Sequence, residues 1–133
     1  MKSSRGFTVI ELLIVVVLFA VASVVFFMQR NQVEIAARDE TRKTSINALY
    51  YSLEEVYFQE NKSYPRTVTE ENLPSVSPDL FKDPSGVKIG ESTSNFRYEP
   101  LNCSGDACKG YSLRADLENE DDYVKTNRST ATE

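Results

Sequence analysis

The sequence contains no histidine, and this absence excludes most catalytic dyads and most zinc sites. It also lacks a glycine-rich phosphate-binding loop and a pair of carboxylates at a spacing typical of acid–base catalysis. Only two cysteines occur, and four residues separate them, whereas a catalytic thiol pair usually has two residues in between. We therefore expect that the protein is not an enzyme.

Proline and glycine are both missing from Phe7 to Ser63. Because helix kinks usually need one of these residues, we expect one continuous helix from Phe7 to about Glu60. Its first half, Phe7 to Met28, is an apolar block of 22 residues. As a helix this block would be about 33 Å long, enough to cross the hydrocarbon core of a membrane. The second half is amphipathic, with apolar residues at three- and four-residue spacings: Ile46, Leu49, Tyr50, Leu53, Val56 and Tyr57.

One carboxylate, Glu11, interrupts the apolar block near its start. An ionised side chain inside a membrane span costs roughly 2.5–3.5 kcal/mol, so it usually has a partner. The basic leader, with Lys2 and Arg5, is expected to stay cytoplasmic. A cut between Gly6 and Phe7 would create an amine that Glu11 of a neighbouring chain could face. In a low dielectric such a pair attracts strongly and would set the register of stacked helices.

The stretch Gly6 to Leu13, Gly-Phe-Thr-Val-Ile-Glu-Leu-Leu, resembles the processing site of type IV pilins and of the pseudopilins of type II secretion. The resemblance implies that a prepilin peptidase cuts between Gly6 and Phe7 and methylates the new amine of Phe7. It also implies that Glu11 guides assembly. The expected fold is α+β and pilin-like: a long N-terminal helix, membrane-spanning in its first half, packs on a small antiparallel β-sheet.

On this basis we expect a structural subunit of a type IV pilus-like filament. The alternatives are a pseudopilin of a type II secretion or DNA-uptake system, and an exported binding domain that does not polymerise. Expected partners are further copies of the chain, the prepilin peptidase, the assembly platform and, before assembly, the membrane. The precursor is expected to cross the cytoplasmic membrane once, with a cytoplasmic N-terminus, and the mature protein to lie in an extracellular or cell-surface filament. The net charge of −5 predicts no direct binding of nucleic acid.

Two other interpretations of the N-terminal segment remain. In the first, the segment is a plain membrane anchor and Glu11 is incidental. In the second, it is a secretory signal, because Ala20-Val21-Ala22 resembles a signal-peptidase site behind a basic start. N-terminal sequencing separates the interpretations, since a processed pilin would begin at Phe7 and a secreted protein at Ser23.

The remaining sequence predicts a helix end, a connection and a sheet. Asn61 is expected to end the helix in a left-handed conformation, and Pro65 prevents its resumption. Period-two alternation predicts one strand at Phe96 and Tyr98 and another from Tyr111 to Leu117, and it allows a short third strand at Val87 and Ile89. The expected divisions are a leader (1–6), two helix halves (7–28 and 29–62), an irregular connection (63–94), the sheet (95–125) and a flexible tail (126–133).

Cys103 and Cys108 lie between the two main predicted strands. An even cysteine count in an exported region predicts one disulfide, which would close the tip of a hairpin. Half a zinc site is the alternative and would need two further ligands. The acidic run after Leu117 carries oxygen ligands of the type that bind calcium, as in the C-terminal loop of pseudopilins, and the candidate ligands are Glu118, Asp121 and Asp122. No other cofactor is expected. Asn127-Arg128-Ser129 has the form of a glycosylation acceptor.

Overall fold

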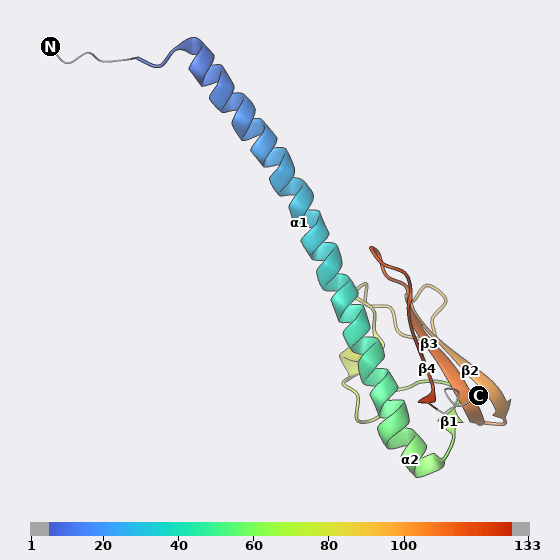
Figure 1. Ribbon diagram of the computed structural model, residues 1–133. Helices are drawn as coiled ribbons and strands as arrows, with labels where there is room; N and C mark the ends of the chain where they lie inside the picture. Colours follow the sequence, from blue (N-terminus) through green and yellow to red (C-terminus); the bar gives the residue numbers. More distant parts are fainter. Residues whose placement is uncertain (1–5, 129–133) are drawn as a thin grey trace. The chain divides into compact units, whose positions relative to one another are not determined.

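The computed structural model describes residues 6–128 of the chain. It has the predicted α+β fold, with a long N-terminal helix and a small antiparallel sheet (Figure 1). The chain divides into two compact units, one ending at Ile35 and the other beginning at Ala36. The elements follow in the order α1 (Val9–Tyr51), η1 (Ser52–Tyr57), α2 (Phe58–Asn61), β1 (Tyr64–Pro65), η2 (Pro78–Phe81), β2 (Phe96–Ser104), β3 (Ala107–Ala115) and β4 (Tyr123–Thr126).

The first unit contains the apolar part of α1. The helix begins at Val9, two residues later than expected, and runs as regular α-helix to Tyr51, in agreement with the missing proline and glycine. Every residue from Phe7 to Met28 is exposed. Among the described residues, one helix is long and apolar enough to cross a membrane, and it contains this block.

In the second unit, one face of the helix is buried against the sheet and the loops. The buried residues of α1 recur at helical spacing, and they begin as polar side chains and continue as apolar ones: Asp39, Arg42, Ser45, Ile46 and Leu49. Leu53 is also fully buried, whereas Val56, predicted on the same face, is 36 % exposed. Glu54 is buried in its place. The reason is η1, a π-helix, whose i to i+5 spacing brings Glu54 onto the face that carries Leu49.

The helix ends one residue later than predicted. Lys62, with a φ of 54°, takes the left-handed conformation expected at Asn61, and its N–H donates to the carbonyl of Phe58 at 2.9 Å. Asn61 stays helical, and its side-chain Nδ2 donates to the carbonyl of Tyr57 at 3.0 Å. β1 follows almost at once, so the connection predicted as irregular begins with a short strand.

The sheet is organised around β3. β2 pairs with β3 along its whole length, so β1 and β4 share the opposite edge of β3. On that edge β1 pairs with Ala107 and Cys108, and β4 pairs with Ser112 to Ala115. The short third strand that the alternation allowed at Val87 and Ile89 is not present in the structure. The structure has only an isolated bridge there, between Lys82 and Lys88.

Among the described residues β2 pairs only with β3, so its other edge is open. Pro100 lies in the middle of this strand, opposite Tyr111. The N–H of Tyr111 donates to the Oδ1 of Asn127 at 3.2 Å, which turns the backbone groups of Tyr111 toward β4. Pro100 and Tyr111 are therefore a non-hydrogen-bonded pair, and the nitrogen of Pro100 faces the open edge, where it offers no donor.

The hydrophobic core of the second unit lies between the helix and the inner face of the sheet, and the loop from Val68 to Phe81 closes one side. An aromatic group occupies its centre, with the ring of Tyr111 4.8 Å from that of Tyr64 and 5.5 Å from that of Tyr98. Each large apolar side chain buried here contributes roughly 1.5–3 kcal/mol. The buried apolar residues are Ile46, Leu49, Leu53, Tyr64, Val68, Leu73, Val76, Phe81, Phe96, Cys108, Tyr111, Leu113 and Ala115.

Candidate functional site

The helix start is fixed by Thr8. Its carbonyl accepts the N–H groups of Glu11 at 3.1 Å and of Leu12 at 3.2 Å, and its Oγ1 also accepts the N–H of Glu11 at 3.3 Å. Thr8 is thus the N-cap of α1, and the spacing Thr-x-x-Glu is a capping signature that the sequence analysis did not use. As a result, the peptide bond between Gly6 and Phe7 lies outside the helix.

The predicted processing residues are accessible. Phe7 is 82 % exposed, and Gly6 and Glu11 are also exposed. A Cβ added to Gly6 would meet no atom within 4 Å, so the fold of this chain does not require glycine there. A partner protein that binds the backbone closely at Gly6 would require glycine at this position. The predicted pairing of Glu11 with an amine on another copy lies between chains and stays a prediction, and Lys2 and Arg5 of the leader lie outside the described residues.

The predicted disulfide joins Cys103 and Cys108. The two residues lie opposite each other on β2 and β3, and the two-residue turn between the strands has Gly105 at a φ of 66°. Glycine adopts this left-handed conformation without steric cost. Because both sulfurs are bonded to each other, neither is a thiolate available to zinc.

The acidic run after β3 meets positively charged side chains. Glu118 forms hydrogen bonds with Arg38 at 2.6 and 2.8 Å, and an ion pair with Arg42 at 2.8 Å. Asp122 lies 3.6 Å from Arg114. Within residues 6–128, no group of three or more histidine, cysteine or acidic side chains is placed to hold a metal ion. The structure therefore does not bring together the three candidate calcium ligands Glu118, Asp121 and Asp122.

We refer to Arg38, Asp39, Arg42 and Glu118 as the ion cluster. Asp39 is 2 % exposed and Arg42 4 %, and Nη1 of Arg42 lies 2.6 Å from Oδ1 of Asp39. The carboxylate of Asp39 also accepts the N–H of Glu118 at 3.0 Å and that of Asn119 at 3.1 Å. The ion cluster thus fastens the loop after β3 to α1 through paired charges.

The ion cluster changes the acidity of both carboxyl groups. Burial by itself would raise the pKa of Asp39, but the backbone N–H groups of Glu118 and Asn119, together with Arg42, outweigh it and hold that pKa below its ordinary value. Hydrogen bonds from Arg38 and Arg42 lower the pKa of Glu118 to about 2. Both groups are therefore charged at neutral pH.

Glu54 is a second buried carboxylate, and tyrosine hydroxyl groups donate hydrogen bonds to it. It accepts hydrogen bonds from the hydroxyl of Tyr111 at 2.9 Å and from that of Tyr64 at 3.2 Å. Burial, and then the charge of Glu54, raise the pKa of Tyr111 well above its ordinary value, so the hydroxyl keeps its proton and donates. The face predicted from the sequence did not include Glu54, because a π-helix leaves no sign in a pattern read at α-helical spacing.

The chain beyond β4 is held in place as far as the structure describes it. Asn127 is 2 % exposed, and Oδ1 of Asn127 lies 2.7 Å from the position that a Cβ on Gly110 would take. Arg128 forms an ion pair with Glu55 at 2.5 Å and a hydrogen bond with the hydroxyl of Tyr50 at 3.3 Å. Residues 126–128 therefore differ from the flexible tail expected there, and the buried amide of Asn127 is closed to a sugar in the folded chain. Residues 129–133 lie outside the described part.

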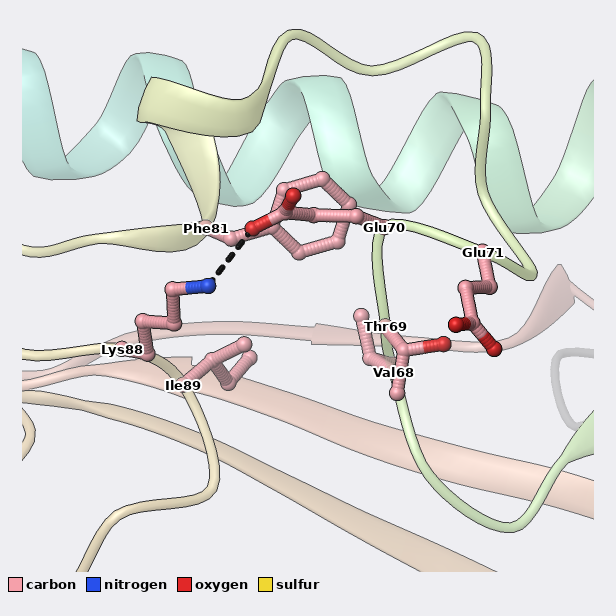
Figure 2. A pocket seen from close by; sticks show the side chains of 7 residues that line it. All are labelled: Val68, Thr69, Glu70, Glu71, Phe81, Lys88 and Ile89. Atoms are coloured by element: carbon pink, nitrogen blue, oxygen red, sulfur yellow. Dashed lines mark hydrogen bonds and ion pairs between the residues drawn. The ribbon is translucent and has the colours of Figure 1, made fainter.

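A cleft of about 410 Å³ opens beside the loop from Val68 to Glu71. Figure 2 shows the amine of Lys88 pointing toward the carboxylate of Glu70, whose side chain overlaps the ring of Phe81 in this view, and the two charged atoms lie 2.8 Å apart. Their hydrogen bond lowers the pKa of Glu70 and raises that of Lys88. Glu70 and Lys88 of this cleft are thus paired with each other.

Comparison with known proteins gives one match. Residues 1–27 match the family described as the Prokaryotic N-terminal methylation motif. The matched stretch contains Gly6, Phe7, Thr8 and Glu11. No curated protein matched the chain, and no solved structure did.

Proposed function

We propose that this chain, whose methylation motif is the hallmark of type IV pilin and pseudopilin precursors, is a structural subunit of a type IV pilus-like filament. The observation that carries the proposal is the apolar surface from Phe7 to Met28, all of which is exposed in the described part of the chain. An exposed apolar surface of this extent needs lipid or other helices around it. Lipid covers it in the precursor, and further copies of the chain cover it in the filament.

Processing is the first step. A prepilin peptidase hydrolyses the bond between Gly6 and Phe7 and methylates the amine that is released. Two features support this step: the bond lies outside α1, and a Cβ added to Gly6 would meet no atom within 4 Å. The same enzyme would explain why glycine occupies a position where any small residue would fit the chain itself.

Assembly is the second step. Glu11 pairs with the amine of Phe7 on a neighbouring copy as the helix moves from lipid into a bundle of helices. The apolar surroundings change little during this transfer, so side-chain packing and charge pairing set the geometry. An acid left without its partner in a low dielectric is costly, and this cost selects the correct register.

The processing step is tested by N-terminal sequencing of the full chain expressed with its peptidase. The exported protein should begin at Phe7. The variant Gly6→Ala should keep all of its first six residues and still fold, because the added methyl group meets nothing in the chain. A wild-type protein that retains Met1 to Gly6 after export would overturn the proposal.

The assembly step is tested by Glu11→Gln, which keeps the shape of the side chain and removes its charge. The variant should enter the membrane and be processed, but electron microscopy should show few filaments or none. Glu34→Gln is the matched control, because Glu34 is also an exposed acid of the first unit but lies beyond the apolar block. Filaments formed equally well by Glu11→Gln would exclude the proposed pairing.

The choice between a pilus and a pseudopilus needs a cellular observation. Filaments on the surface of cells that have the protein, and their loss from cells without it, would indicate a pilus. A loss of protein export or of DNA uptake, with surface filaments unchanged, would favour a pseudopilin instead.

A further inference from the structure

We infer that Thr8 is a positioning residue for processing: as the N-cap of α1, it keeps the bond between Gly6 and Phe7 outside the helix, where a peptidase can reach it. The inference rests on the proposed function, because it concerns the proposed cleavage. It adds a role for a residue that neither contributes charge to assembly nor forms part of the bond that is cut.

The geometry at the helix start supports this role. The first helical hydrogen bonds end on the carbonyl of Thr8, and its side-chain oxygen accepts the N–H of Glu11 a second time, at 3.3 Å. The hydroxyl group thus gives the amide of Glu11 a second acceptor, beside the carbonyl of Thr8 at 3.1 Å, as the side chain of an N-cap does. Gly6 and Phe7 precede this cap and are not helical.

The position of the helix start decides whether the bond can be attacked. If α1 began one turn earlier, the carbonyl of Gly6 would accept the N–H of Ile10, since helical bonds join residues four apart. Hydrolysis needs that carbonyl oxygen free, because the enzyme must stabilise the negative charge that develops on it. Water then adds to the carbonyl carbon and the C–N bond breaks. The nitrogen of Phe7 takes up a proton, leaving a carboxylate on Gly6.

The surroundings explain why the cap holds the helix start in place. Thr8 stands at the beginning of the apolar block, where an amide without a hydrogen-bond partner is costly in lipid. Without the hydroxyl group, the amide of Glu11 loses one of its two acceptors and the stabilisation of a helix start at Val9 falls, so growth of the helix toward the leader becomes more favourable. Such growth makes Gly6 and Phe7 helical and covers the bond to be cut.

The test compares three variants of the full-length precursor, in membranes with a prepilin peptidase. Thr8→Val keeps the shape and removes the hydroxyl group, whereas Thr8→Ser and Thr8→Asn keep a capping group. We expect Thr8→Val to be cleaved about five-fold more slowly, which corresponds to the loss of a typical N-cap. Thr8→Ser and Thr8→Asn should be cleaved at about the rate of the wild type. Carbon chemical shifts of the uncut precursor in micelles should show helical values at Gly6 and Phe7 only in Thr8→Val.

The outcomes separate this inference from the proposed function. Cleavage of Thr8→Val at the wild-type rate overturns the inference and leaves the proposed function standing. Slow cleavage of Thr8→Asn with an unchanged helix start also overturns it, because the peptidase would then recognise the threonine itself. If the wild type is not cut between Gly6 and Phe7, the proposed function is overturned as well.

Discussion

Replacing Arg42 with methionine tests whether the ion cluster holds the loop after β3 against α1. The change removes the cation beside Asp39, which is 2 % exposed, and leaves that carboxylate buried with only backbone N–H partners. Methionine fills a similar volume, so the effect of an empty space is small. Removing one partner of a buried ion pair costs about 3–5 kcal/mol. We expect the lower end, about 3 kcal/mol, because the backbone hydrogen bonds remain.

Urea unfolding of the full chain in detergent micelles, followed by the circular dichroism of its tyrosines, measures this loss. For a small domain the free energy of unfolding falls by about 1–3 kcal/mol for each molar of urea. A loss of about 3 kcal/mol therefore lowers the unfolding midpoint by roughly 1.5 M. The slope of the transition should stay the same, since the surface exposed on unfolding does not change.

Lys43→Met is the matched control. Lys43 lies one position further along α1 and pairs with Glu120 at 2.6 Å, but this pair is at the surface. Exposed ion pairs contribute little to stability, so the midpoint should barely move. The reasoning would be refuted if Arg42→Met and Lys43→Met lowered the midpoint by the same small amount.

Three further predictions concern the second unit. The lowered pKa values of Asp39 and Glu118 mean that the unfolded chain binds more protons in acid than the folded chain does. The free energy of unfolding should therefore be at its full value above about pH 5 and decline toward pH 2. In an acid titration the decline should be less steep for Glu118→Gln. Gly110→Ala should cost roughly 1–3 kcal/mol, because its methyl group would overlap a buried side-chain oxygen, and a thermal melt at an unchanged temperature would contradict this. Replacing Cys103 and Cys108 together by serine should remove about 2 kcal/mol in urea unfolding, the value for so short a loop, whereas an unaltered midpoint would show that the disulfide adds nothing.

The main architecture was predictable because it depends on local patterns. The missing proline and glycine predicted the unbroken α1, and period-two alternation predicted β2 and β3. The two short strands were missed for a physical reason. β1 has only two residues and β4 four, too few to show a period, and each is defined by its pairing with β3. The inward turn of Glu54 was missed because η1 follows a spacing different from that of an α-helix.

The candidate site divides in the same way. Gly6, Phe7 and Glu11 could be found from the sequence, because they lie at a fixed spacing within a few residues of one another. The capping role of Thr8 was equally local and could have been predicted from Thr-x-x-Glu. The ion cluster could not, because Asp39 and the backbone it binds at Glu118 are 79 residues apart. The sequence shows these acids and arginines but does not show which of them lie next to each other in the fold.

Pro100 bears on what happens when many copies stand side by side. In the filament proposed above, the sheets of neighbouring subunits would lie close together, and a complete row of free N–H groups along β2 would favour edge-to-edge strand pairing of the kind that leads to amyloid. The proline leaves a gap in that row halfway along the strand. Edge-to-edge pairing between copies is thereby disfavoured, and in the proposed filament the contacts between copies would come from the apolar helices instead.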